Sequence, residues 1–135
     1  MKSRDALIRL KRFEVEEKRR TVSDIEAMIA EFRQMAADLD RQIAVEQERA
    51  GVTDINHYAY PTFARAAVDR RDNLFDSVRE LESKLQGARE LLAEAEEDLR
   101  RISLLEERDA SRGKGADAGA HQAALTAQTH QRVAS

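Results

Sequence analysis

An unbroken heptad seam in the second half of the sequence most constrains what this chain can fold into. Steps of alternately four and three residues meet nine apolar side chains in succession, at Leu74, Val78, Leu81, Leu85, Ala88, Leu92, Ala95, Leu99 and Ile102. Apolar positions that recur every 3.5 residues form a narrow stripe, which a helix buries against another helix in a left-handed supercoil. The pattern predicts a coiled coil and leaves open which helix is the partner.

The first half of the sequence contains a matching helix. Over residues 4–49 the same step meets apolar residues without interruption from Val22 to Ile43, and lysines interrupt it earlier, at Lys11 and Lys18. Gly51 suits the left-handed residue that follows a helix end, and Pro61 is favoured at a first helical position. We therefore expect helix 1 at about 4–49, a loop at 50–61 and helix 2 at about 62–109. Two helices of similar length joined in this way predict an all-α, antiparallel two-helix coiled-coil hairpin over residues 1–110.

The charges at the two ends of this pattern favour the same pairing. Residues 1–20 hold eight basic and four acidic residues, a balance of +4, and residues 89–109 hold four basic and eight acidic residues, a balance of -4. An antiparallel hairpin places these segments side by side, whereas a parallel dimer would place like charges together. Each exposed pair contributes only a fraction of a kcal/mol, but all of them favour one orientation.

Composition limits the class of protein further. The chain is 36% charged and 4% aromatic, with no cysteine, which is typical of long helices with a thin apolar seam and removes disulfides and thiolate chemistry. The first residues lack the apolar core of a signal peptide, and no window is apolar enough to span a membrane, so we expect a cytoplasmic protein. Residues 111–135 lose the heptad pattern and are expected to form a flexible tail.

Catalysis and nucleic-acid binding are disfavoured by the same features. Two helices packed along one seam form no concave pocket, and His57, His121 and His130 lack metal-ligand spacing. We expect no enzyme, no catalytic or metal-binding residue, no cofactor and no small-molecule substrate. Glutamates at positions 14, 16 and 17 interrupt the basic residues of helix 1, so we expect no nucleic-acid partner either.

Apolar residues away from the seam gather near both ends of the expected hairpin. At the free end these are Leu7, Leu10, Phe13, Leu104 and Leu105, and at the turn they are Tyr58, Tyr60 and Phe63. Further along the helices, Met28, Met35 and Phe75 are off the seam too. All of them either widen the hairpin's own core and close its turn, or form surfaces that bind a partner.

The start, the loop and the heptads together resemble the flagellar export protein FliJ family, in the form found in alphaproteobacteria. The resemblance covers residues 1 to about 110. It rests on Leu7-x-x-Leu10, on the run Phe13-Glu14-Val15-Glu16-Glu17-Lys18, on the loop Ile55-Asn56-His57-Tyr58-Ala59-Tyr60, on Phe63 and on the heptads of helix 2.

The resemblance implies a coiled coil similar to the central stalk of rotary ATPases, at the flagellar base beside the inner membrane. It also implies action as a general export chaperone. Its partners would be the hexameric export ATPase, the cytoplasmic domain of the export gate membrane protein and the export chaperones, and it would be a monomer when free. By position, the ATPase-facing residues would be Leu7, Leu10, Phe13 and Val15, and the gate-facing residues Tyr58, Tyr60 and Phe63. Ala67, Arg70 and Leu74 occupy the following gate-binding positions without matching the enterobacterial residue types. The alternative is a generic coiled-coil dimerisation or scaffold protein, which would be a stable dimer at micromolar concentration.

Overall fold

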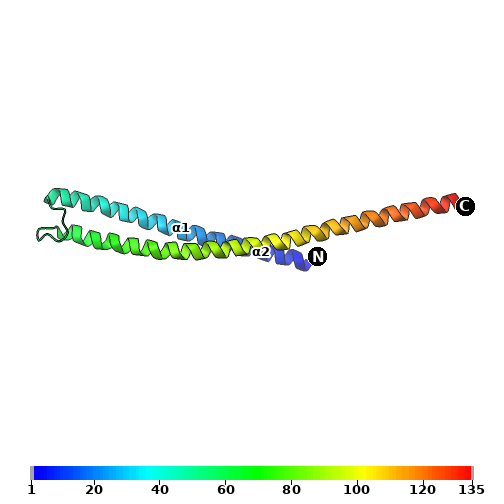
Figure 1. Ribbon diagram of the computed structural model, residues 1–135, viewed down its shortest axis with the longest axis horizontal. Helices are drawn as coiled ribbons and strands as arrows, with labels where there is room; N and C mark the ends of the chain where they lie inside the picture. Colours follow the sequence, from blue (N-terminus) through cyan, green and yellow to red (C-terminus); the bar gives the residue numbers. More distant parts are fainter. Residues whose placement is uncertain (1, 135) are drawn as a thin grey trace. The chain divides into compact units, whose positions relative to one another are not determined.

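The computed structural model describes the backbone of residues 2–134 and the side chains of residues 3–113. This part of the chain contains helix α1 (Lys2–Ala50) and helix α2 (Thr62–Ala134), joined by a loop at 51–61 (Figure 1). The chain divides into two compact units. The hairpin unit is Glu16–Ala93, and the terminal unit is Met1–Val15 with Glu94–Ser135.

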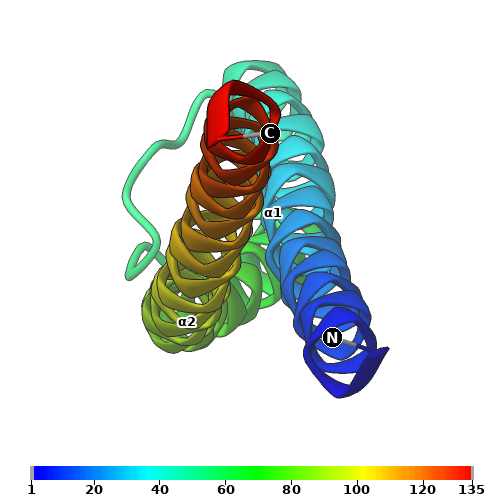
Figure 2. The same cartoon turned by 90° about the vertical axis from the view of Figure 1, so that its right-hand side faces the viewer.

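The hairpin unit confirms the predicted antiparallel pair of helices. Its parts of α1 and α2 lie side by side and are connected by the loop in both ribbon views (Figures 1 and 2). One core cluster is formed by the buried side chains of Val22, Ile29, Val78, Leu81, Leu85 and Ala88. A second cluster, nearer the loop, is formed by Leu39, Ile43, Ala67 and Val68. Most of these residues belong to the predicted seams, so the 3.5-residue period identified the buried face of both helices.

The seam of α2 also continues upstream of Leu74, where the sequence pattern is weak. Ala64 is 0% exposed, and Ala67 and Val68 are buried as well. Alanine side chains are therefore core residues near the turn, although they bury little area each.

Gly51 ends α1 in the way that the sequence predicts. Its φ of +70° lies in the left-handed region, where a residue with a Cβ is strained. The Gly51 amide donates to the carbonyls of Gln47 at 2.9 Å and Glu48 at 3.3 Å, and the Val52 amide donates to the carbonyl of Gln47 at 3.3 Å. These bonds satisfy carbonyls at the end of the helix and form a Schellman motif, which turns the chain out of the helix direction.

The terminal unit pairs the first turns of α1 with the part of α2 that follows residue 93. Ile8, Val15 and Ala95 are its buried apolar residues among the side chains described. The backbone of α2 is helical to Ala134, beyond the end predicted at about 109. The predicted flexible tail, 111–135, falls mainly on residues whose side chains lie outside the described part, so its flexibility stays a prediction. Neither helix, over the residues described, is long and apolar enough to cross a membrane.

Candidate functional site

The terminal unit exposes a group of large apolar side chains. Leu7 is 41% exposed, Leu10 52% and Phe13 61%. They follow one another at three-residue spacing along α1, so consecutive members are neighbours on its surface. On α2, Leu104 and Leu105 are about half exposed as well. We call Leu7, Leu10 and Phe13 the free-end surface.

Val15 does not belong to this surface. It is only 2% exposed, because it is seven residues from the buried Ile8 and lies on the same face of α1. A partner could contact Val15 only by opening the helix pair. Of the four residues expected to face the ATPase, Val15 is therefore buried. The other three, Leu7, Leu10 and Phe13, are exposed.

Arg4 connects the two helices of the terminal unit. Its guanidinium forms an ion pair and hydrogen bond with Asp109, and its Nη1 lies 3.6 Å from Glu106 Oε2. The hydrogen bond from Arg4 is the main reason that the pKa of the Asp109 carboxyl lies below its ordinary value of 3.8, and the charges of Arg4 and Arg112 add to it. The same contacts raise the pKa of Arg4.

This pair predicts a pH dependence with a definite sign. A carboxyl whose pKa is lowered by folding stabilises the folded state above its unfolded pKa, and the stabilisation disappears as pH falls through the lowered value. The contact between α1 and α2 at Arg4 should therefore persist at neutral pH and weaken below about pH 4. Carboxyl NMR titration of Asp109 measures this directly, and Arg4→Gln should raise the pKa of Asp109 toward 3.8.

Arg100→Gln is the matched control for that titration. Arg100 donates a hydrogen bond to Glu97 on its own helix and is the main cause of the lowered pKa of that carboxyl. Its removal should raise the pKa of Glu97 and leave the pKa of Asp109 in place. An Asp109 pKa that does not respond to Arg4→Gln would contradict the contact.

Only part of the predicted charge complementarity appears as contacts between the helices. Besides Arg4, the cross-helix pairs of the described residues are Arg33 with Glu82 and Arg71 with Asp40. Lys11, Arg19 and Arg20 instead pair with glutamates three residues away on α1. Local partners at this spacing are always within reach on a helix surface, so they compete with partners across the helix pair.

Tyr60 closes the turn of the hairpin unit. It is 5% exposed, and its hydroxyl accepts a hydrogen bond from Gln47 Nε2 at 2.9 Å. The Arg65 guanidinium lies over the Tyr60 ring at 5.7 Å and donates to the carbonyl of Ile55 at 2.7 Å. Tyr60 thus packs inside the hairpin. Of the three residues expected to face the gate, it is the buried one.

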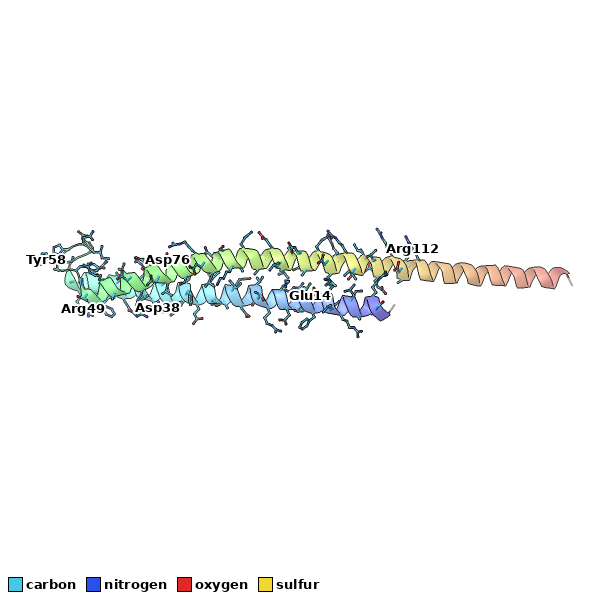
Figure 3. The ribbon with its side chains drawn as sticks, turned by 90° about the horizontal axis from the view of Figure 1, so that it is seen from below. Glu14, Asp38, Arg49, Tyr58, Asp76 and Arg112 are labelled. Atoms are coloured by element: carbon cyan, nitrogen blue, oxygen red, sulfur yellow. The ribbon has the colours of Figure 1, made fainter. Side chains whose placement is uncertain are left out.

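The other two aromatic residues of the turn are exposed. Tyr58 is 95% exposed and lies on the loop (Figure 3). Phe63 is 57% exposed in the first turn of α2. The Tyr58 ring stacks on His57 with centroids 4.6 Å apart. Hydrogen bonds hold the loop around them, with Asp54 Oδ1 accepting from the Asn56 amide and His57 Nδ1 accepting from the Ala59 amide. Tyr58 is therefore presented on an ordered loop.

A shallow groove lies on the hairpin unit between the two helices. It has a volume of about 260 Å³ and is lined by Phe32, Met35, Arg70, Asn73, Leu74 and Ser77. We call it the Met35 groove. Met35 is off the seam in the sequence, but only the packing of α1 against α2 shows that it shares a groove with Leu74 and Arg70.

The described side chains form no cluster of three or more histidines and carboxylates that could hold a metal ion. The comparisons leave the family open: no family model, no curated protein and no solved structure matches this chain.

Proposed function

We propose that this chain is a non-enzymatic coiled-coil stalk or adaptor of the flagellar type III protein export apparatus. It docks its free-end surface in the hexameric export ATPase, contacts the export gate through the turn, and escorts export chaperones. Its place is the cytoplasmic side of the inner membrane at the flagellar base. The exposure of Leu7, Leu10 and Phe13 in the terminal unit is the observation that carries the proposal.

The free-end surface supports docking because the seam is already occupied. The seam side chains of α1 and α2 pack against one another, so they offer little to a further partner. Leu7, Leu10 and Phe13 remain about half exposed on consecutive turns. Clustered exposed apolar residues mark interaction sites, and aromatic and leucine side chains bury large areas when a pocket receives them.

The turn supports the gate contact in the same way. Tyr58 and Phe63 are exposed there, and the Met35 groove lies on the same hairpin unit. Exposed aromatic residues on an ordered loop are good anchors, since little entropy is lost when they bind. Arg70 and Leu74 line the groove. They occupy gate-binding positions of the resembled family, although their residue types differ from the enterobacterial ones.

ATP hydrolysis by the export ATPase tests the proposal. The wild-type chain should stimulate turnover, because one asymmetric stalk in a six-fold ring promotes contact between subunits. Leu7→Asp with Leu10→Asp should raise the half-saturating concentration by about thirtyfold or more, since each substitution removes roughly 1 kcal/mol or more of docking energy. Titration of the chain into the ATPase measures both effects.

Val45→Asp with Leu91→Asp is the matched control. Both residues are about half exposed in the hairpin unit, so the chemical change is the same outside the free-end surface. The control should stimulate as the wild type does. Turnover that is the same with and without the chain, in every mixture, would refute the proposal.

A further inference from the structure

We propose that the hairpin unit binds a second copy of this chain through a charged groove. The groove has a volume of about 500 Å³ and runs between α1 and α2. Glu26 and Arg33 line it from α1, and Glu82 and Arg89 line it from α2. Its remaining lining is Ile29 with Ala30 and Leu85 with Gln86.

The two walls of the charged groove repeat one sequence pattern. On α1 it is Glu26-x-x-Ile29-Ala30-x-x-Arg33, and on α2 it is Glu82-x-x-Leu85-Gln86-x-x-Arg89. Every residue that lines the groove from α1 has a counterpart at the same spacing on α2. Because the two helices are antiparallel, an approximate two-fold axis normal to the groove relates the two walls.

This arrangement fixes where the four charges lie. Arg33 forms an ion pair with Glu82 across one end of the groove. The equal spacing then places Glu26 and Arg89 opposite each other at the other end, and neither has an ion-pair partner among residues 3–113. The two acids lie on one diagonal of the groove and the two bases on the other.

Such a charge pattern is complementary to itself. When two copies face each other and are related by a two-fold axis in the interface plane, the diagonals are exchanged. Each acid then faces a base of the other copy, whether that axis runs along the helices or across them. Self-complementarity is the requirement of an isologous contact between identical chains, and a different partner would not need it. This is why we assign the groove to a second copy.

The same features predict a weak association. The ion pairs would be exposed, and exposed pairs contribute little and are screened by salt. Ala30 is small enough to let the helices approach, but Ile29 and Leu85 are already buried in the hairpin's own core. The chain should be a monomer at low micromolar concentration and a dimer at high concentration in low salt. The free-end surface takes no part, so the inference and the proposed function can fail independently.

Sedimentation velocity of the full chain tests this inference. Between about 10 and 500 µM at about 50 mM salt, the wild type should shift from monomer toward dimer, and about 500 mM salt should weaken the association at least tenfold. R33E/R89E gives four acids in the groove and E26R/E82R gives four bases, so each variant alone should remain a monomer. An equimolar mixture of the two variants should form a heterodimer.

R41E/R79E is the matched control, because it changes the net charge as R33E/R89E does. Arg41 and Arg79 are exposed on the hairpin unit and, among the side chains of residues 3–113, pair only with aspartates on their own helices. This control should still dimerise, and circular dichroism checks that every variant keeps its helices. A wild-type chain that stays monomeric in low salt, or a variant mixture that stays monomeric while both variants are folded, would overturn the inference.

Discussion

Leu85→Asp is expected to destabilise the hairpin unit strongly, whereas Leu91→Asp on the same helix is expected to leave its stability almost unchanged. Leu85 is 8% exposed and packs in the cluster with Val22, Ile29, Val78, Leu81 and Ala88. The substitution removes a buried leucine side chain and places a carboxylate in an apolar cluster. The first change alone typically lowers the free energy of unfolding by about 2 to 5 kcal/mol.

The carboxylate adds a desolvation penalty, so the total loss should reach about 4 kcal/mol or more. Domains have only about 5 to 15 kcal/mol of stability in total, so a loss of this size should lower the melting temperature and the urea midpoint steeply. Leu91 is 52% exposed, and its replacement should change the free energy of unfolding by less than about 1 kcal/mol.

Far-UV circular dichroism with thermal and urea unfolding measures both variants. Equal stability of the two variants would mean that Leu85 is not a core residue and that the α1–α2 pairing in the hairpin unit is wrong. A native-like Leu85→Asp variant with a shifted dimer equilibrium would lead to the same conclusion.

Tyr60→Ala is expected to lower the free energy of unfolding by about 3 kcal/mol or more, and Tyr58→Ala by less than about 0.5 kcal/mol. Tyr60 is 5% exposed and Tyr58 95%, so the same change removes packing in one case and almost none in the other. Tyr60→Phe should cost about 1 kcal/mol, because it leaves the ring and removes only the hydrogen bond from Gln47.

The same pair of substitutions separates stability from binding at the turn. Tyr58→Ala should keep the melting temperature and weaken the proposed gate contact, which a pull-down or titration with the gate's cytoplasmic domain measures. Unfolding curves of Tyr58→Ala and Tyr60→Ala that coincide would contradict the buried position of Tyr60.

The sequence was sufficient for the pairing of the two helices in the hairpin unit, because the heptad step depends only on which residues are apolar, but it placed the end of α2 at about 109 instead of Ala134. It was insufficient near the turn, where Ala64 and Ala67 fill the core. Alanine is common on exposed helix surfaces too, so its burial cannot be inferred from residue type alone. The step of four and three residues does lead back from Leu74 through Arg71 to Ala67, Ala64 and Tyr60. Apart from the charged Arg71, this is the signal that could have identified Tyr60 as buried.

The candidate surfaces were harder to predict than the fold. Val15 is a seam position by the heptad step and an ATPase-facing position by the family resemblance. Only the structure shows that its side chain is buried in the core. The charged groove was not apparent in the sequence. Glu26 and Glu82 line the same groove only when α1 and α2 are aligned in this register.

That register depends on the turn. A slip of α2 by seven residues would still place apolar residues opposite apolar residues, since both seams repeat with that period. Three features at the loop are compatible with only one alignment of α1 with α2. They are the Schellman motif at Gly51, the Gln47–Tyr60 hydrogen bond and the Arg65–Ile55 hydrogen bond. Matched deletions of one heptad from each helix would preserve both the seam and these bonds. The length of such a hairpin can thus change between related sequences in whole heptads while the turn stays the same.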